Sequence, residues 1–340
     1  MATVDHVGIR SQTSEDPMRV TWVGHATLLV QVNGLTFLTD PVFSDRCSAS
    51  QRVGPRRFRP PALSLADLPP IDAVLLSHNH YDHLDKESVD ALGNRPLWLV
   101  PLGLKAWLHA RGITHCLEVG WWDEVPLRGD RVKVRLLAVA LPAQHWSART
   151  PWDRNRSLWC GWAVVPGGGA ASAGGGGSDH ADPGGGERFY FAGDTAYHPG
   201  VFDVIGKKHG PFDVAAIPVG AHEPRWFMSA QHCNPAEAVT MHRELRSKRS
   251  FAIHWGAFPL AGDSHLQAPR ELVAARRAVG LPDAGAGAFE VLRHGESLIC
   301  GQPRREACLF SGDGGGADAE AGAGTAAAVA AGGCSGGGGQ

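Results

Sequence analysis

Metal-binding side chains crowd into one short stretch of the chain. Residues 78–83 read His-Asn-His-Tyr-Asp-His and directly follow an apolar run that is typical of a buried strand. His78 and His80 are two residues apart and can point the same way, whereas Asp82 and His83 follow after a tight turn. Four ligands this close cannot all reach one tetrahedral ion without strain. The spacing therefore favours two neighbouring metal sites over the alternative, an exposed polar loop.

Three more candidate ligands follow later predicted strands. They are His145 in Leu-Pro-Ala-Gln-His-Trp, Asp194 in Phe-Ala-Gly-Asp-Thr and His254 in Phe-Ala-Ile-His-Trp. A lone histidine is more often a hydrogen-bonded structural residue than a ligand. Beside the pattern at 78–83, however, residues at strand ends are well placed to complete a metal centre, because α/β sheets tend to put their chemistry there.

Composition excludes several classes of protein. The net charge of −2 gives no field for gathering nucleic acid, and the seven scattered cysteines, with no Cys-x-x-Cys pair, read as reduced thiols. The first twenty residues lack the apolar core of a signal peptide, and no apolar run approaches the roughly 18 residues of a membrane span. We therefore expect a cytoplasmic protein whose membrane contact is at most peripheral.

The elements that must position these ligands belong to a mixed α/β chain. Asn33-Gly34 predicts a hairpin turn, and Asn234-Pro235 predicts a helix start with an N-cap followed by proline. Strands are predicted at 27–32, 35–40, 71–76, 96–100, 132–139, 158–165, 188–193, 213–218, 250–254 and 288–292, and helices at 86–92, 102–111, 235–246 and 269–279. A weak internal echo places an aspartate after each of two strand pairs, at Asp40 and Asp194, which two packed half-sandwiches would explain.

Two glycine-rich segments stand apart from this pattern. Segments of such composition bury too little apolar area to offset their ordering entropy, so we expect a flexible insertion at 167–186 and a disordered Gly/Ala-rich tail at 306–340. The remainder is predicted to be an N-terminal arm, 1–19, and a single domain, 20–305.

Motifs spread from about residue 20 to residue 300 resemble one family. They are Trp-Val-Gly-His-Ala-Thr at 22–27, Leu-Thr-Asp-Pro at 38–41, Gly-Pro-Arg-Arg-Phe-Arg at 54–59, Pro-Pro-Ile-Asp at 69–72, the stretch 77–85, Gly-Asp-Thr at 193–195, Glu-Pro-Arg-Trp-Phe-Met at 223–228 and His-Gly-Glu-Ser at 294–297. Together they resemble the N-acyl phosphatidylethanolamine-hydrolysing phospholipase D family of the metallo-β-lactamase superfamily. The resemblance implies a four-layer αββα sandwich with a dinuclear metal site at one edge.

The resemblance also implies a ligand set with two Zn²⁺ per chain. His78, His80 and His145 would hold one ion, Asp82, His83 and His254 the other, and Asp194 would lie between them. The histidine-rich donors suit zinc, and Asn79 stands where diiron relatives usually carry glutamate, which disfavours redox chemistry on two irons.

Further roles are expected around the metals. Asp82 would orient the attacking water besides binding zinc, and Asp40 or Asp85 would accept the spare N–H of a ligand histidine; for Asp40 the alternative is turn capping before Pro41. Tyr81 is expected to hydrogen-bond a phosphate oxygen. Gln231 and His232 resemble a family pair that lines the substrate pocket, where His232 would stabilise or protonate the leaving oxygen, unless it only packs near the following helix.

The expected function is hydrolysis of N-acyl phosphatidylethanolamine to N-acylethanolamine and phosphatidic acid by a zinc-dependent phosphodiesterase of phospholipase D type. The partner is then a phospholipid at a membrane surface, and a homodimer is left open. The alternatives are a dinuclear zinc hydrolase of a small soluble phosphodiester or lactone, and a non-catalytic lipid- or metal-binding protein. His222 and Cys233-Asn234 depart from the family pattern beside the expected pocket and leave acyl-chain and headgroup preference open.

Overall fold

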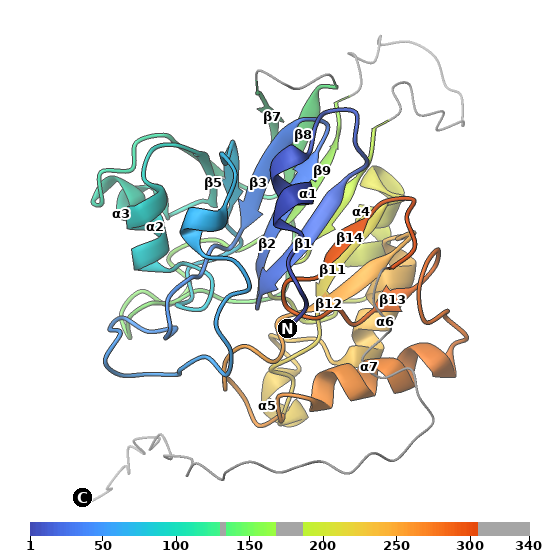
Figure 1. The fold of residues 1–340 in the computed structure, drawn as a ribbon. Helices are drawn as coiled ribbons and strands as arrows, with labels where there is room; N and C mark the ends of the chain where they lie inside the picture. Colours follow the sequence, from blue (N-terminus) through green and yellow to red (C-terminus); the bar gives the residue numbers. More distant parts are fainter. Residues whose placement is uncertain (130–133, 168–185, 305–340) are drawn as a thin grey trace, which may run out of the picture. The chain divides into compact units, whose positions relative to one another are not determined.

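Two seven-stranded sheets form the centre of the fold (Figure 1). The computed structural model describes residues 1–129, 134–167 and 186–304, all of which lie in one unit that spans Met1–Phe310. In strand order, the first sheet comprises β14 (Ser297–Ile299), β1 (Arg19–Gly24), β2 (Thr27–Val32), β3 (Leu35–Thr39), β4 (Ala73–Leu75), β5 (Leu97–Pro101) and β6 (Cys116–Val119). The second comprises β13 (Phe289–Glu290), β12 (Ser250–Ile253), β11 (Val214–Pro218), β10 (Phe189–Phe191), β9 (Gly161–Pro166), β8 (Leu136–Leu141) and β7 (Glu124–Leu127).

The two sheets repeat one pattern of strand pairing. In the first, β14, β1, β2 and β3 pair antiparallel, and β3, β4, β5 and β6 pair parallel. In the second, β7, β8, β9 and β10 pair antiparallel, and β10, β11, β12 and β13 pair parallel. Asp40 and Asp194 therefore follow equivalent strands, β3 and β10, so the weak echo in the sequence corresponds to a repeated half-sandwich.

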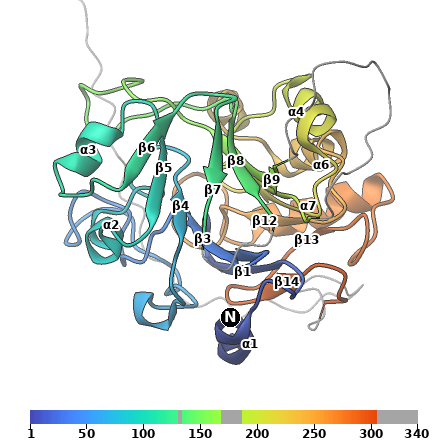
Figure 2. The same cartoon turned by 90° about the horizontal axis from the view of Figure 1, so that it is seen from above.

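Helices cover the outer face of each sheet (Figure 2). Apart from α1 (His6–Ser11), η1 (Leu65–Asp67) and the short α5 (Arg225–Met228), they are α2 (Lys86–Leu92) and α3 (Lys105–His109) beside the first sheet and α4 (Val201–His209), α6 (Pro235–Glu244) and α7 (Gln267–Ala278) beside the second. Val89 and Leu108 pack with Trp98 of the first sheet, whereas Phe202 and Leu272 belong to the core of the second. This is the expected αββα sandwich.

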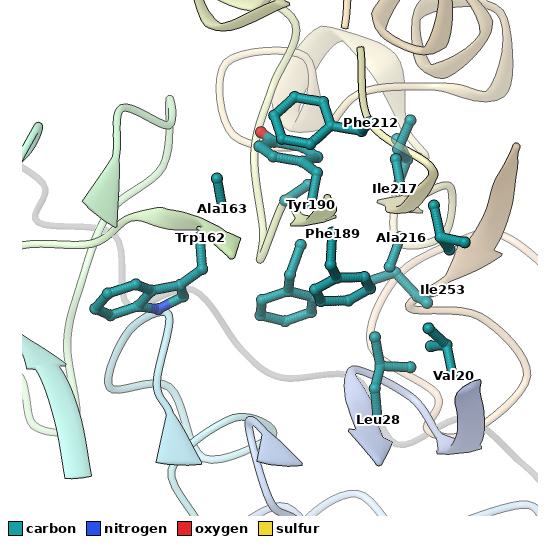
Figure 3. Packing of buried hydrophobic residues seen from close by; sticks show 14 of the residues in the cluster. Val20, Leu28, Trp162, Ala163, Phe189, Tyr190, Phe212, Ala216, Ile217 and Ile253 are labelled. Carbon is teal, nitrogen blue, oxygen red and sulfur yellow. The ribbon is translucent and has the colours of Figure 1, made fainter. Parts of the chain in front are cut away.

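The main core lies between the two sheets. Val20 and Leu28 of the first sheet face Phe189 and Ile253 of the second (Figure 3), and all four side chains are buried. Phe37 adds a ring contact to Phe189, with centroids 5.9 Å apart. Because strands β2 and β3 face a second sheet on one side and helices on the other, they are buried along their whole length, which explains why apolar residues stand next to one another, as at Leu28-Leu29-Val30.

Several expected elements are confirmed. The hairpin turns at Asn33 and Gly34, both with positive φ, and α6 begins at Pro235 with Asn234 as its N-cap in a capping box with Glu237. The expected helix 102–111 is shorter, and its regular part is α3. Elements that were not predicted from the sequence are β1, β6, β7, β14, α1, η1, α4 and α5.

The N-terminal arm is folded against the first sheet. Ile9 of α1 is buried, and its carbonyl accepts a hydrogen bond from Gln31 Nε2 of β2. The glycine-rich insertion, apart from Gly167 and Gly186, and the tail at 306–340 lie outside the described residues. Within the described part of the chain, no helix has the length and apolar character that crossing a bilayer requires.

Candidate metal centre

The seven predicted ligands meet at one edge of the sandwich, because each follows the carboxyl end of a strand. β4 leads into the loop that carries the first four, β8 leads to His145, β10 to Asp194 and β12 to His254. Strands from both sheets contribute, so residues far apart in the sequence converge where the sheets lie face to face. Backbone strain accompanies the convergence: His254 has a φ of 62°, in the left-handed region.

The first group is a trio of ring nitrogens. His80 Nδ1 lies 2.9 Å from His78 Nε2 and 3.3 Å from His145 Nε2. Asp194 Oδ2 stands 3.9 Å from His78 Nε2 and 3.7 Å from His145 Nε2. Three imidazole nitrogens and a carboxylate facing one point form a donor set that suits a tetrahedral zinc ion.

The second group shares the same Asp194 oxygen. Oδ2 lies 3.2 Å from His83 Nε2 and 3.1 Å from His254 Nε2. Asp82 Oδ2 completes the group at 3.2 Å from His83 Nε2 and 3.3 Å from His254 Nε2. Asp194 therefore stands between two sets of donors, as the position of a bridging carboxylate requires.

The ring nitrogens that face the centre of each of the two groups are available to bind a cation. His78 Nδ1 contacts the Ser77 hydroxyl at 2.9 Å, His83 Nδ1 contacts Asp40 Oδ2 at 2.6 Å, and His145 Nδ1 contacts the carbonyl of Gln231 at 2.8 Å. If each Nδ1 carries the proton that these partners accept, the Nε2 lone pairs point inward. His83 Nε2 is buried without a hydrogen-bond partner, as is His254 Nε2. These orphaned atoms fit a metal centre.

The electrostatics of the two groups differ. Burial lowers the pKa of His80 and of His145 to about 4, so both rings are neutral at pH 7, the form that binds metal. Burial alone would also lower the pKa of His254, but the Asp194 charge outweighs it and raises the pKa to about 9. Burial alone would raise the pKa of Asp194, yet the neighbouring His254 and His83 hold it well below its usual range. The second group thus holds protons where a cation can replace them.

Asp40 occupies the position expected of a residue that supports the ligands. Besides His83 Nδ1, its carboxylate accepts the backbone N–H and the hydroxyl of Ser77, which in turn contacts His78. One buried carboxylate therefore orients a histidine in each group. The backbone carbonyl of Gln231 has a similar role, because it contacts His145, whereas the sequence suggested only that Gln231 lines the substrate pocket.

The expectation for Asp85 is wrong. Its carboxylate accepts hydrogen bonds from the backbone of Phe43 and Ser44 and from the hydroxyls of Ser44 and Ser88. Within the described parts of the chain, none of its hydrogen bonds reaches a histidine ring. Asp85 precedes α2 and ties the 43–44 segment to the start of that helix, so its acceptors are used up before it can support a ligand.

The three expected substrate residues are placed differently from one another. The His232 ring lies over the ligands, with its centroid 5.0 Å from that of His145 and 5.4 Å from that of His254, and its Nδ1 is buried without a partner. The Tyr81 hydroxyl instead donates to the carbonyl of Arg149 at 2.9 Å, so its proton is directed away from the ligands. Gln231 contributes its carbonyl, as described above.

Two residues of the centre had no role predicted from the sequence. His25 Nε2 lies 2.9 Å from Asp82 Oδ2, and Arg149 Nη1 donates to the carbonyls of Asn79 and Leu84 at the two ends of the ligand loop, at 2.8 Å each. The family-like motif at 22–27 contained the signal for His25. For Arg149 the only signal is its position four residues after His145.

Comparisons with known proteins show the fold and the superfamily of the chain. A family model described as a Beta-lactamase superfamily domain matches residues 36–255. Solved structures of similar fold include a metallo hydrolase from the archaeon Ignicoccus hospitalis (20% identity, 83% of this chain and 97% of that chain, TM-score 0.57). A diiron β-hydroxylase from Streptomyces venezuelae matches with 22% identity over 84% of this chain and 54% of its own length, at a TM-score of 0.58.

Two curated relatives carry more specific names. "N-acyl-phosphatidylethanolamine-hydrolyzing phospholipase D 1" of Caenorhabditis elegans is 42% identical over 268 residues, which cover 76% of this chain and 69% of that protein. The mitochondrial "N-acyl-phosphatidylethanolamine-hydrolyzing phospholipase D" of Saccharomyces cerevisiae is 32% identical over 264 residues, or 77% of this chain and 52% of its own length. The chain thus spans about half to two thirds of these relatives. It belongs to the metallo-β-lactamase superfamily and, within it, to the N-acyl-phosphatidylethanolamine-hydrolysing phospholipase D family.

Proposed function

We propose that the protein is a dinuclear zinc phosphodiesterase that hydrolyses N-acyl phosphatidylethanolamine to N-acylethanolamine and phosphatidic acid. The observation that carries the proposal is the Asp194 oxygen shared by two groups of buried donors. The names of the two curated relatives supply the substrate class. When bound, two zinc ions would supply an activated water and neutralise charge on the phosphoryl group.

The ligand assignment follows the two groups. His78, His80 and His145 would hold one ion, Asp82, His83 and His254 the other, and Asp194 both. His25 and His232 lie within reach of the same groups as further donors. Five imidazoles with two carboxylates favour zinc, because sites that are richer in oxygen suit iron or magnesium better. Asn79, whose backbone carbonyl accepts from Arg149, supplies no further carboxylate to the loop.

His232 would assist the leaving oxygen in this reaction. Burial lowers its pKa to about 3, so the ring is neutral at pH 7 and Nδ1 is free of protein partners. A neutral imidazole there can hydrogen-bond the ethanolamine oxygen as it leaves phosphorus, and the proton that this oxygen gains balances the proton that the attacking water loses. Water oxygen then joins phosphorus as the phosphorus–ethanolamine oxygen bond breaks, which leaves phosphatidic acid.

An apolar surface near the centre supports a lipid substrate. We name it the apolar rim: Phe58, Trp226, Phe227 and Leu260, which are 50%, 83%, 59% and 37% exposed. Phe58 and Leu260 line the same small hollow as His254. The backbone N–H of Gly262, two residues after Leu260, donates to the carbonyl of Glu223. Glu223 lies just before α5, the helix that contains Trp226 and Phe227. Aromatic side chains of this kind partition into membrane interfaces. The membrane surface is therefore the proposed place of action.

Two basic side chains beside Phe58 of the apolar rim are engaged in contacts within the protein. Arg57 is buried, donates to the carbonyls of Val42 and Ser44 and lies over the Phe258 ring at 4.5 Å. Arg56 is exposed but paired with Asp45 at 2.7 Å. Apolar insertion is accordingly the larger part of the proposed membrane contact.

Mass spectrometry of the products from N-acyl phosphatidylethanolamine in mixed micelles tests the proposal. We expect N-acylethanolamine and phosphatidic acid from the wild type and neither product from His80→Ala, whose zinc content should also fall. A soluble phosphodiester and a lactone, assayed in parallel, identify the alternative functions. Turnover of those compounds with no product from the lipid, or release of a free fatty acid, contradicts the proposed chemistry.

A further inference from the structure

We infer that His25 is a positioning residue, which holds the Asp82 carboxylate in the orientation that the second metal ion requires. The inference rests on the proposed metal centre. His25 Nε2 lies 2.9 Å from Asp82 Oδ2, the same oxygen that faces His83 and His254. Among the described residues, His25 alone hydrogen-bonds this carboxylate without being one of the seven proposed ligands.

The backbone at His25 is built to deliver the ring to this place. β1 ends at Gly24, and the chain reverses into β2 at Thr27 through His25, whose φ is 55°. A left-handed conformation is unfavourable for a residue with a side chain and persists only where the surroundings enforce it. The His25 carbonyl accepts from Trp22 Nε1 at 2.9 Å and from the backbone N–H of His254 at 3.1 Å. The same turn therefore fixes His25 and a proposed ligand together.

Packing leaves the His25 ring little freedom to rotate. Its side chain is buried, and its centroid lies 4.2 Å from that of His254 and 5.3 Å from that of Phe258, which it meets edge to face. The other nitrogen, Nδ1, is buried without a partner. With the proton on Nε2, the ring donates to Asp82, and only the Nδ1 lone pair lacks a partner. With the proton on Nδ1, a buried N–H group would have no acceptor, which costs more free energy.

A donor at this position has a specific consequence for Asp82. The buried carboxylate projects from the loop between His80 and His83, and its other contacts in the described structure are with the ligand rings of His83 and His254. A hydrogen bond from a residue outside the ligand set restricts the rotation of the carboxylate. Less conformational entropy is then lost when the metal binds. Supporting residues of this kind typically change metal affinity by about 10–100-fold.

The test compares four forms of the full chain: wild type, His25→Phe, His25→Gln and His242→Phe. Phenylalanine keeps the ring but removes the donor, and glutamine restores an N–H near the position of Nε2. His242 is a second buried histidine, bonded to Ser250 and remote from the ligands, so its variant controls for the loss of a buried imidazole. Zinc affinity is measured by chelator competition, and ligand geometry by the absorption spectrum of the cobalt-substituted protein.

We expect His25→Phe to bind one ion as the wild type does and the second about 10–100-fold more weakly. His25→Gln should recover most of that affinity with a spectrum close to wild type, and His242→Phe should match the wild type. Unchanged affinity for both ions in His25→Phe overturns the inference. Equal weakening in both His25 variants with an altered cobalt spectrum also overturns it, because His25 would then be a direct ligand.

The proposed function and this inference fail in different ways. A wild type with fewer than two tightly bound metal ions contradicts the dinuclear centre itself. If His25→Phe does not fold, as judged by circular dichroism, His25→Gln decides: near-wild-type affinity supports the donor role, and a loss of the second ion overturns it.

Discussion

Asp40 Oδ2 lies 2.6 Å from His83 Nδ1, and both side chains are fully buried. The contact assigns the tautomer of His83, because a carboxylate can only accept. Through Ser77 the same carboxylate reaches His78, so one residue at the end of β3 orients a ligand of each metal group. A substitution of Asp40 therefore tests how both metal groups are held in place, without removing a ligand.

Asp40→Asn should therefore weaken metal binding without removing a ligand. The amide keeps one acceptor oxygen but can present an N–H to His83 Nδ1, which disfavours the required tautomer. We expect a loss of about 10–100-fold in zinc affinity, measured by chelator competition, and a parallel loss of activity at limiting zinc. Asp85→Asn is the matched control, because no histidine of the described chain bonds to Asp85, and its zinc affinity should stay at the wild-type level. Equal losses in the two variants would contradict the role given to Asp40.

The stability of the metal-free protein should have an optimum near pH 6.5. His80 and His145 have folded pKa values of about 4, so the unfolded chain binds more protons than the folded one between pH 4 and about 6.5, and stability rises with pH there. His254 has a folded pKa of about 9, so the folded protein binds the extra proton between about 6.5 and 9, and stability falls as pH rises through that window.

Zinc should abolish the high-pH limb of this profile, since it replaces the protons of the second group. Differential scanning calorimetry between pH 5 and 9, with chelator and with zinc, measures both profiles. A Tm of the chelated protein that stays constant or rises from pH 7 to 9 would show that His254 does not hold a proton in the metal-free state.

His232→Ala should separate chemistry from metal binding. The ring lies beside the ligands but is not one of the seven, so we expect two zinc ions per chain and a decrease in kcat of about 10²–10⁴-fold. His232→Asn tests whether a neutral hydrogen-bonding group suffices, in which case kcat should recover partly. Zinc analysis alongside steady-state kinetics makes the distinction, and loss of one zinc ion from His232→Ala would instead identify His232 as a ligand.

Most of the metal ligands could be predicted from the sequence, but fewer of the residues that hold these ligands in place could. Ligands at strand ends were predictable because imidazole and carboxylate side chains crowded behind a buried strand, as at 78–83, are typical of a metal site. The partner of a carboxylate was not predictable: Asp85 is two residues after His83, whereas Asp40 follows a separate strand. Only the structure shows that Asp40 reaches His83 and that Asp85 is used by the 43–44 segment. Hydrogen bonds between segments that are far apart in the chain produce no periodic pattern of residue types in the sequence.

The same limit explains the elements that were missed. β1 is buried on both faces, and its alternation of polar and apolar residues covers only Arg19–Trp22, the shortest run that indicates a strand. β6 and β7 lie at sheet edges, have four residues each and include exposed positions, which makes them indistinguishable from loop by pattern. β14 completes the first sheet from the far end of the chain, a pairing that no local signal specifies.

The apolar rim should matter for vesicles and not for soluble substrates. Replacing Trp226 and Phe227 by serine removes two exposed aromatic side chains while leaving the ligands in place. We expect weaker sedimentation with phosphatidylethanolamine-containing vesicles and a lower rate on substrate in those vesicles, with an unchanged rate on a soluble phosphodiester. The matched control replaces Val204 of α4 and Leu117 of β6, which are exposed apolar residues outside the rim. If both double variants bind vesicles equally, the rim is not the membrane contact.

Arg149 should be important for the stability of the ligand loop. Its guanidinium donates to the carbonyls of Asn79 and Leu84 and lies 4.1 Å over the Tyr81 ring, so it contacts the loop at both ends and in the middle. Arg149→Met leaves two carbonyls without their donor. Since a hydrogen bond from a charged group contributes about 1.5–3 kcal/mol, we expect the free energy of unfolding to fall by about 2–4 kcal/mol.

Lysine at position 149 distinguishes charge from geometry. An ammonium can replace one of the two bonds but not the planar stacking on Tyr81, so Arg149→Lys should fall between the wild type and Arg149→Met in urea unfolding. Arg154→Met is the control, because Arg154 lies over Trp146 at 5.1 Å, is exposed and has no hydrogen bond to the loop in the described structure; it should change the free energy of unfolding by less than about 0.5 kcal/mol. If Arg149→Lys and Arg149→Met are equally destabilised, the bidentate geometry carries the effect; if neither is destabilised, the loop does not depend on Arg149.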